Sequence, residues 1–382
     1  MIYLDNAATT GRKPPEVISA VNNALQTLSA NPGRSGHRIS EKAATEMYET
    51  RALIADTFSA SGAENVIFTL NCTQSINTVL KGVLRDGDHV VTSDLEHNAV
   101  MRPLVKTGVS YTAVEVSLTD DSETLERFEN AVTDRTRLII VTAASNVCGK
   151  TLPLEGIGKI AEKHGILFAV DGAQGAGVIP IDMKRMNIDF LCIAPHKGFY
   201  APMGTGILIA EKPIGNTIIE GGTGTDSVSF VQPLSTPEGF ESGTVNLPGI
   251  CGIKAGVKYV KRLGARVVRH ETALALLFYG ELKKTEGVLL YTPAPDFPLY
   301  APVISFNIEG LNSQVVANLL NRHGIAVRAG LHCAPAAHRK LGTLDIGTVR
   351  VSPAVFNTKT EMEKTAEVIK KISDNRKKLI EI

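Results

Sequence analysis

Short apolar runs that alternate with amphipathic segments constrain the fold of this chain most strongly. Six strand-like runs lie between about residues 14 and 210, at 66–69, 89–92, 138–142, 166–170, 190–193 and 206–209. Each run is short and largely apolar, as expected for strands that are covered on both faces. Segments such as 153–164, which Gly165 follows, have the spacing and the stop signal of helices. The pattern predicts an α/β fold with a mainly parallel sheet.

The composition changes in the second half of the chain. Residues 221–248 are rich in Gly, Ser, Thr and Pro, which favours a functional loop over a packed element. We expect one long helix over roughly 249–284, then a strand at 302–306, a helix, a loop that carries Cys333, and a C-terminal helix. Because 382 residues exceed one ordinary core, we predict a large domain over 13–248. The segments 1–12 and 249–382 are expected to form a smaller α+β domain with the Cys333 loop.

Charge and cysteine usage exclude several classes of protein. A net charge of +1 provides no basic field, which argues against nucleic acid as a partner. No apolar run approaches the roughly 20 residues of a membrane span, and residues 1–5 lack the features of a secretory signal. We therefore expect a cytoplasmic protein without a membrane partner. The five cysteines are far apart and form no C-x-x-C pair, so neither a metal site nor a disulfide framework is expected.

Polar residues follow two of the predicted strands at the point where each strand ends. Asp171 directly follows the run 166–170, and Lys197 comes shortly after the run 190–193. Ligands of open α/β sheets bind at the carboxyl ends of strands, so both side chains should face one crevice. A Lys amine that forms a Schiff base and an Asp that keeps a pyridinium nitrogen protonated are what a pyridoxal phosphate enzyme needs. The alternatives are a turn-forming Asp before Gly172 and an exposed loop amine.

Motifs spread over nearly the whole chain resemble those of one family. They are Tyr3-Leu4-Asp5-Asn6-Ala7-Ala8, Glu96-His97-Asn98, Ser145-Asn146-Val147-Cys148-Gly149, Asp171-Gly172-Ala173-Gln174, His196-Lys197, Glu241-Ser242-Gly243-Thr244, Arg328-Ala329-Gly330-Leu331-His332-Cys333-Ala334 and Arg350. In these motifs the chain resembles the fold-type I, class V aminotransferase-family enzymes, and among them the NifS/SufS group of cysteine desulfurases. The loop around Cys333 is similar to the shorter, SufS-like (group II) form. The resemblance implies a pyridoxal 5'-phosphate cofactor bound to a large domain with a mainly parallel sheet.

The resemblance also implies roles for residues around the cofactor ring and its phosphate. His97 would stack on the ring and act as an acid or base, and Gln174 would hydrogen-bond the phenolic oxygen. Thr73 lies near the start of an expected helix, whose N-terminus favours an anion, and would bind the phosphate with help from His196. Cys72 stands where the family usually has a second hydroxyl residue.

One implied contact comes from a second copy of the chain. Thr244 matches a position that, in the family, reaches the phosphate of the neighbouring subunit. The expected assembly is therefore a homodimer with shared active sites. The alternative for Thr244 is an ordinary turn rich in glycine.

Substrate-binding roles follow from the same resemblance. Arg350 resembles the residue that binds the substrate carboxylate, because a guanidinium matches a carboxylate in bidentate geometry. Arg328 resembles a second positive group there, and Asn146 lies where the family contacts the substrate. Ala8 and His37 match positions near the mouth of the site.

Cys333 indicates which reaction the cofactor would serve. It lies in a loop between Gly330 and Pro335 and is flanked by Arg328 and His332, and nearby cations lower the pKa of a thiol. In a desulfurase the thiolate attacks the sulfur of the bound cysteine and keeps it as a persulfide. The alternative is a buried cysteine in a turn. The short loop should move little, so a protein acceptor would have to reach in, and residues 335–340 are where we expect its contacts.

The sequence thus predicts a homodimeric, pyridoxal phosphate-dependent cysteine desulfurase that converts L-cysteine to L-alanine. Lys197, His97 and Cys333 are the expected catalytic residues. Three alternatives stay open at this point. They are a selenocysteine lyase acting on L-selenocysteine, a class V aminotransferase or β-lyase that does not use Cys333, and a sulfur carrier or scaffold with an inactive site.

Overall fold

The computed structural model describes residues 1–33, 35–225 and 227–380. Its elements up to the end of the large sheet are β1 (Ile2–Tyr3), α1 (Pro15–Thr27), α2 (Arg38–Phe58), η1 (Ala63–Asn65), β2 (Val66–Thr69), α3 (Cys72–Val83), β3 (His89–Ser93), α4 (Asn98–Thr107), β4 (Ser110–Val114), α5 (Asp121–Ala131), β5 (Thr136–Thr142), α6 (Leu154–His164), β6 (Leu167–Asp171), β7 (Phe190–Ile193) and β8 (Gly206–Ala210). The later elements are η2 (Glu238–Phe240), α7 (Leu247–Leu263), α8 (Arg266–Lys283), β9 (Val288–Leu290), β10 (Ile304–Ile308), α9 (Ser313–Arg322), β11 (Ile325–Ala326), β12 (Arg328–Gly330), α10 (Pro335–Lys340), β13 (Thr348–Val351), α11 (Lys359–Asp374) and α12 (Arg376–Ile380).

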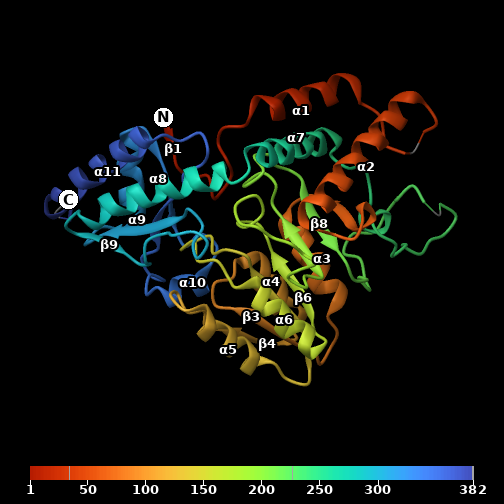
Figure 1. The fold of residues 1–382 in the computed structure, drawn as a ribbon, viewed down its shortest axis with the longest axis horizontal. Coiled ribbons are helices and arrows are strands. Elements are labelled where there is room, and N and C mark those ends of the chain that lie inside the picture. The colour runs from red at the N-terminus through yellow and green to blue at the C-terminus, as the bar shows by residue number, and fades with distance from the viewer. Residues whose placement is uncertain (34, 226, 381–382) are drawn as a thin grey trace.

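A seven-stranded sheet in the order β2-β8-β7-β6-β5-β3-β4 lies at the centre of the larger part (Figure 1). The neighbours from β7 to β4 are parallel, and only β8 runs antiparallel to β2 and β7. The α/β fold with a mainly parallel sheet is therefore confirmed. The sequence prediction missed β4, because four of its five residues are exposed at the sheet edge and do not form an apolar run.

Alternating residues of the sheet face two separate cores. In β5, Ile139 and Val141 belong to one core, together with side chains of α2, α6 and α7. Leu138 and Ile140 belong to the other, together with side chains of α3 and α4. Helices thus cover both faces, which accounts for the continuous apolar strands and leaves the strand ends as the open edge.

The smaller part is built on a four-stranded antiparallel sheet in the order β12-β13-β10-β9. Its core contains side chains of α8, α9 and α11 and also Leu4 from the N-terminal segment. The strand β1 pairs in parallel with β11, with Ile2 opposite Ile325. Figure 1 shows this part in blue and cyan, with both chain ends on its side of the molecule.

The expectation of one long helix over 249–284 is wrong. Two helices, α7 and α8, occupy this stretch, and Gly264 separates them with φ 53° and ψ −141°. Only glycine adopts this conformation readily, so the helix is interrupted there. Buried residues of α7 lie in a core of the large part, whereas those of α8 lie in the core of the small part. The chain therefore passes from the core of the large part to the core of the small part at Gly264. We predicted the domain boundary earlier in the chain, after residue 248, and that boundary stays a prediction.

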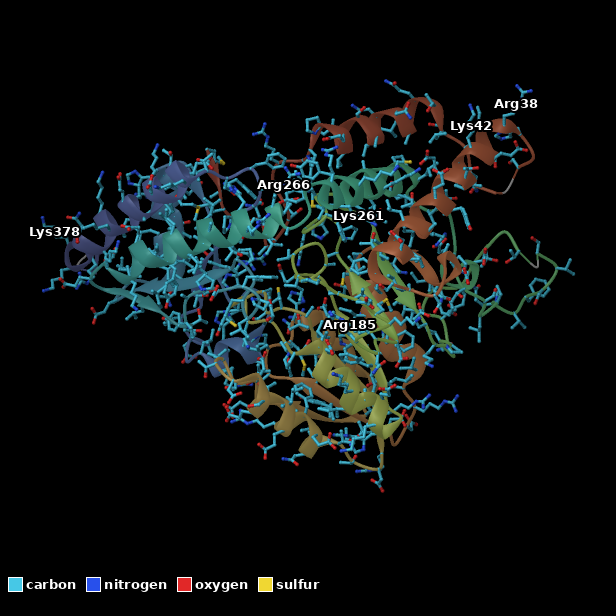
Figure 2. The ribbon with its side chains drawn as sticks, in the orientation of Figure 1. Arg38, Lys42, Arg185, Lys261, Arg266 and Lys378 are labelled. Atoms are coloured by element: carbon cyan, nitrogen blue, oxygen red, sulfur yellow. The ribbon has the colours of Figure 1, made fainter. Side chains whose placement is uncertain are left out.

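The surface carries its basic side chains on several elements. Figure 2 labels Arg38 and Lys42 on α2, Lys261 on α7, Arg266 on α8, Arg185 between β6 and β7, and Lys378 on α12. They lie on several sides of the molecule, with Arg38 and Lys42 close together at the start of α2. Within the described ranges, no helix is both long enough and apolar enough to span a membrane.

Candidate active site

The carboxyl ends of β6 and β7 bring Asp171 and Lys197 into one crevice. Asp171 is the last residue of β6, is 3% exposed and pairs in register with Cys192 of β7. Its Oδ1 accepts a hydrogen bond of 2.9 Å from the Ala173 amide and one of 3.6 Å from the Cys72 thiol. Lys197 follows β7 in a turn in which its amide bonds the Ala194 carbonyl at 3.1 Å.

The electrostatic surroundings of Lys197 suit a nucleophilic amine. Burial lowers the pKa of Lys197, and the nearby Asp171 carboxylate raises it in part. Among the described residues, Lys197 Nζ has no hydrogen-bond or ion-pair partner. A buried lysine with a lowered pKa is a neutral amine for a larger fraction of the time, which is the form that attacks a carbonyl carbon.

The N-terminus of α3 opens onto the same crevice. Cys72, the first residue of α3, contacts Asp171, and Asn71 caps the helix by accepting a 2.9 Å hydrogen bond from the Gln74 amide. Thr73 is exposed beside them. Burial and the charge of Asp171 raise the pKa of Cys72 well above its usual value, so this thiol stays protonated.

These groups fit pyridoxal phosphate. Lys197 provides an amine without another partner for the aldehyde, and Asp171 provides a buried carboxylate for the pyridinium nitrogen. The start of α3 provides unbonded amides and a dipole for a phosphate. The three features come from three separate elements and meet at one edge of the sheet.

His97 lies at the N-terminus of α4 and caps it. Its Nδ1 accepts a 2.9 Å hydrogen bond from the Ala99 amide, so we assign the proton of the neutral ring to Nε2. Burial lowers the pKa of His97, and the charges of Asp171 and Lys197 also act on it. His97 therefore belongs to the same crevice.

Glu96 is a buried acid that the sequence analysis quoted in a motif without assigning it a role. It is 0% exposed, and its Oε1 accepts hydrogen bonds from the Thr142 amide at 2.9 Å and from the Ser93 hydroxyl. Its Oε2 is buried without a partner among the described atoms. Burial is the main cause that raises the pKa of Glu96 to about 8. The side chain is therefore mostly protonated at neutral pH.

Gln174 contacts the N-terminal segment from the loop that follows β6. Its Nε2 donates a 2.8 Å hydrogen bond to the Ala7 carbonyl. Ala8 lies in the same segment, where its amide bonds the Asp5 carbonyl at 3.1 Å. A 50 Å³ cavity is lined by Ala7, Gln174 and Lys197. The structure therefore brings this N-terminal segment to the Lys197 crevice.

His196 bonds the N-terminal segment through its ring. Its Nδ1 lies 3.0 Å from Thr9 Oγ1. Burial, with the charges of Lys197 and Lys13, lowers the pKa of His196 to about 4. The ring is therefore neutral at physiological pH and could contribute a hydrogen bond to a phosphate, but no positive charge.

Arg350 and Arg328 lie directly opposite one another on β13 and β12. Arg350 is 1% exposed and donates 2.8 Å hydrogen bonds to Asp5 Oδ1 and to the Asn146 carbonyl. Its Nε is buried and has no partner among the described atoms. No ion pair of Arg328 occurs among the described residues. Two opposed cations with one carboxylate leave an excess of positive charge, which is unfavourable until an anion binds. The arrangement therefore suits a carboxylate ligand.

Cys333 carries the exposed thiol of the chain, whereas the other four cysteines are buried. Both His332 and Cys333 have left-handed backbone conformations, with φ 50° and 57°. Such conformations cost non-glycine residues about 1–3 kcal/mol each and persist where surrounding contacts hold them. Two contacts do so here. Asn146 Nδ2 donates 2.8 Å to the His332 carbonyl, and the Asn98 amide donates 2.7 Å to the Cys333 carbonyl.

A groove of about 390 Å³ joins Cys333 to the cofactor side of the site. Thr73 and His97 line it together with Cys333. Basic side chains from α3 and α4 also line it, namely Lys81, Arg102 and Lys106. The thiol, the proposed acid and the proposed phosphate residue therefore share one open space.

The expected contribution of His332 to the reactivity of Cys333 is wrong. Burial, followed by the charge of Arg350, lowers the pKa of His332 to about 2. The ring is neutral at physiological pH and adds no positive charge beside the thiol. Cationic surroundings come instead from the basic residues that line the groove.

Two predicted site residues lie apart from this crevice within one chain. Thr244 is exposed and lines a separate hollow of about 290 Å³ with Leu70 and Gln74. His37 is exposed and caps α2, its Nδ1 accepting a 3.3 Å hydrogen bond from the Ser40 amide. Neither residue lines the Lys197 cavity or the Cys333 groove. Both roles stay predictions, and that of Thr244 requires a second copy of the chain.

The segment 335–340 forms the short helix α10. Its Lys340 is paired with Asp94 at 3.0 Å and with Glu115 at 3.5 Å, so that this charge is engaged within the chain. Arg339 is exposed. The predicted acceptor contact there stays a prediction.

Comparisons with known proteins agree with this geometry. The family model described as aminotransferase class-V matches residues 2–365. A probable cysteine desulfurase from Methanothermobacter thermautotrophicus is 32% identical over 383 residues, covering 97% of this chain and 94% of the relative. A probable cysteine desulfurase from Xylella fastidiosa is 34% identical over 387 residues, covering 97% and 91% respectively.

Solved structures share the fold over nearly the whole chain. A cysteine desulfurase from Thermococcus onnurineus, solved in its apo form, superimposes with a TM-score of 0.89 at 33% identity and covers 98% of this chain and 95% of its own. The S-sulfonic acid form of a cysteine desulfurase from Escherichia coli has a TM-score of 0.87 at 27% identity, with 97% and 94% covered. The family match, the relatives and the shared fold together show that this chain belongs to the class-V aminotransferase family.

Proposed function

We propose that the protein is a pyridoxal phosphate-dependent cysteine desulfurase that converts L-cysteine to L-alanine and takes the sulfur onto Cys333. The observation that carries the proposal is that the exposed thiol of Cys333 lines the same groove as His97. The loop of Cys333 is hydrogen-bonded to Asn146, and the carbonyl of Asn146 also accepts a hydrogen bond from Arg350. An aminotransferase would need no such thiol. The names of the relatives, which the chain matches over nearly their full length, support the same activity.

Arg350 and Arg328 are proposed to bind the carboxylate of the amino-acid substrate. Asp5 and the Asn146 carbonyl hold two of the Arg350 nitrogens and so orient the guanidinium group. Asn146 also holds the His332 carbonyl. The anchor for the substrate and the loop of the nucleophile are therefore connected through one residue.

Lys197, Asp171, Gln174, His97 and the start of α3 are the residues that would hold the cofactor. When bound, pyridoxal phosphate supplies an electron sink that stabilises negative charge on the amino acid. The Asp171 carboxylate favours the protonated ring nitrogen that this sink requires. Lys197 Nζ, whose pKa burial lowers, is the base proposed to take the proton from the substrate α-carbon.

Cys333 is proposed to attack the substrate sulfur as a thiolate. An S–S bond forms while the substrate Cβ–S bond breaks, and the electron pair of the broken bond leaves with Cβ. The Cβ atom then takes a proton, which gives alanine. His97 lines the same groove with its proton on Nε2 and is the proposed acid.

A homodimer is proposed because the loop after β8 exposes several apolar side chains. Val228, Phe230 and Val231 are 93%, 108% and 79% exposed, and this loop reaches out from the body of the large part in Figure 1. Exposed apolar clusters of this kind mark interaction surfaces. Thr244 lies beyond η2 in the same connection and would approach a neighbour's site in such a dimer. The protein sulfur acceptor, the SufS-like subgroup and the cytoplasmic location are kept as predictions.

A product assay on the purified protein tests the proposed function. We expect L-cysteine to give alanine and, with dithiothreitol present to reduce the persulfide on Cys333, an equal amount of sulfide. Cys333→Ala should keep the visible absorbance of the cofactor but lose at least about 100-fold in alanine formation. Cys251→Ala, at a buried cysteine of α7, is the matched control and should keep its activity.

Other outcomes would identify the alternatives. Full cysteine activity in Cys333→Ala would exclude a persulfide on Cys333. Turnover of L-selenocysteine with little turnover of L-cysteine would indicate a selenocysteine lyase, and a keto-acid product would indicate an aminotransferase. A purified protein that binds no cofactor would leave a carrier or scaffold as the explanation.

A further inference from the structure

Two buried histidines and a threonine form a hydrogen-bonded chain behind the Cys333 loop. The rings of His332 and His338 lie edge to edge and nearly coplanar, with centroids 5.5 Å apart and 12° between their planes. His332 Nδ1 lies 3.3 Å from His338 Nε2, and His338 Nδ1 lies 2.8 Å from Thr343 Oγ1. The three residues are 4%, 0% and 0% exposed. The reaction described above uses none of these side chains.

The direction of the hydrogen bonds can be assigned from the partners. Thr343 Oγ1 lies 3.4 Å from the His338 carbonyl, which takes the single hydroxyl hydrogen. His338 Nδ1–H then donates to Thr343, and His338 Nε2 accepts from His332 Nδ1–H. His332 Nε2 is left without a proton, and it is buried without a partner among the described atoms. The chain of three residues thus holds the ring of His332, to which the backbone of Arg328 also bonds.

His332 is held at its backbone as well as at its ring. Asn146 Nδ2 binds the His332 carbonyl, while His338 binds its ring. The left-handed conformations of His332 and Cys333 follow one another directly, so a change at one residue moves the other. The direction in which the Cys333 thiol projects therefore depends on contacts made by its neighbour.

We propose that His338, supported by Thr343, is a positioning residue that acts through His332 to hold the Cys333 thiol in its working orientation. This inference rests on the proposed function, in which Cys333 receives the sulfur. The α10 helix, which carries His338, would then position the Cys333 nucleophile in addition to any contact with a partner. His338 forms no hydrogen bond with Arg350, Asp5 or Asn146 among the described residues, so its loss should change kcat more than substrate binding.

Kinetics of three variants test the proposal. In His338→Ala, kcat for alanine formation should fall about 10- to 100-fold, the size of effect that a displaced reacting group produces, while KM changes less than about 3-fold. Thr343→Val keeps the shape of the side chain without the hydroxyl and should lower kcat by a smaller factor. Thr343→Ser, which keeps the hydroxyl, should restore kcat.

His89→Ala is the matched control. His89 is also buried and bonded to threonine hydroxyls, with Nδ1 2.9 Å from Thr136 Oγ1 and 3.4 Å from Thr133 Oγ1, and Nε2 2.9 Å from Thr112 Oγ1. It lies at the start of β3, at the opposite end of that strand from Glu96 and His97. This variant should lose stability but keep its kcat.

Amide hydrogen exchange gives a readout that does not depend on turnover. Peptides that cover residues 331–334 should exchange at least about 10-fold faster in His338→Ala or Thr343→Val than in the unchanged protein or in His89→Ala.

An unchanged kcat in a folded His338→Ala, a change in KM alone, or unchanged exchange at 331–334 would each overturn the proposal. If His338→Ala does not fold, Thr343→Val and Thr343→Ser decide. If Cys333→Ala keeps full activity the proposed function fails, yet the exchange experiment still tests whether His338 holds the loop.

Discussion

The Lys197 crevice and the Cys333 loop place their reactive groups in opposite environments. Lys197 and Asp171 lie at the ends of buried parallel strands, where desolvation changes the pKa of the lysine. Cys333 is exposed on a loop with a strained backbone that side-chain and main-chain hydrogen bonds hold. The contrast is expected if the crevice moves protons and stabilises charge, which works best away from water. A thiol that hands an atom to another molecule must instead remain accessible.

The cysteines show the same contrast within one residue type. Cys72 and Cys192 lie beside Asp171, and burial with that nearby charge raises the pKa of both thiols well above the usual value. They are small neutral side chains that pack under the cofactor site. Cys333 differs because the chain leaves the sheet and turns to the surface there.

Removal of the crevice amine should have the largest effect. Lys197→Ala takes away both the group that would anchor the cofactor and the base for the α-carbon, so alanine formation should fall by more than the ~10²–10⁴-fold typical of one acid or base. The assay is alanine release at saturating cysteine. Iodoacetamide should still modify Cys333 in this variant at its normal rate, because the loop does not depend on the crevice. Substantial alanine formation without Lys197 would show that the crevice does not supply the cofactor anchor and the base.

Removal of the substrate anchor should have an intermediate effect. In Arg350→Lys, the ammonium group cannot replace the planar donors, and KM for L-cysteine should rise about 10- to 100-fold, the equivalent of one to two charged hydrogen bonds. Steady-state kinetics measure this change. Asp5→Asn keeps the cation but weakens its orientation, so its KM should rise less. Equal effects of the two variants would mean that Arg350 acts mainly through its pairing with Asp5.

The buried acid Glu96 should have the smallest effect, and on stability rather than on turnover. Its folded-state pKa of about 8 lies above the ordinary carboxyl value, so the folded state keeps a proton that the unfolded chain releases. The contribution of Glu96 to the free energy of unfolding should therefore fall as the pH rises toward 8, by at most about 1.4 kcal/mol per pH unit. Urea unfolding at pH 6 and pH 8 measures this slope.

Glu96→Gln is the comparison for that slope. It should remove the contribution of Glu96 to the slope, because the amide does not titrate, whereas the contribution of Glu271, whose pKa burial raises to about 7, stays in both proteins. His196 and His332, with folded-state pKa values of about 4 and about 2, are protonated near pH 6 only in the unfolded chain, so they make the free energy of unfolding rise with pH by the same amount in both proteins. The same slope in both proteins would show that Glu96 is ionised in the folded state.

Local patterns predicted those features that depend on neighbouring residues. The strands of the large sheet and the placement of Asp171 and Lys197 followed from apolar runs with polar residues at their ends. The edge strand β4 was missed because its residues are mostly exposed, and the α7–α8 break was missed although Gly264 stands at it. The apolar residues on both sides of Gly264 have helical spacing, so the sequence pattern did not show that the helix is interrupted there and that the chain passes from one core to the other.

Contacts between distant segments could not be predicted in this way. Asp5 and Arg350 are 345 positions apart, and Asn146 and His332 are 186 apart, yet each pair forms a hydrogen bond. The neutral state of His332 also depends on burial, which its polar neighbours in the sequence do not reveal. Thr244 and His37 were predicted from family resemblance, and one chain alone does not bring them to the crevice.

The sequence by itself determined the α/β architecture, the polar residues at the strand ends and the presence of a cysteine between glycine and proline, because each depends on residues close together in the chain. Only the tertiary structure decided how these parts act on one another. It paired Arg350 with Asp5, tied the Cys333 loop to Asn146 and buried His332 against His338. The physical reason is that pKa values and side-chain orientation depend on burial and on through-space partners, and folding brings those partners from every part of the chain.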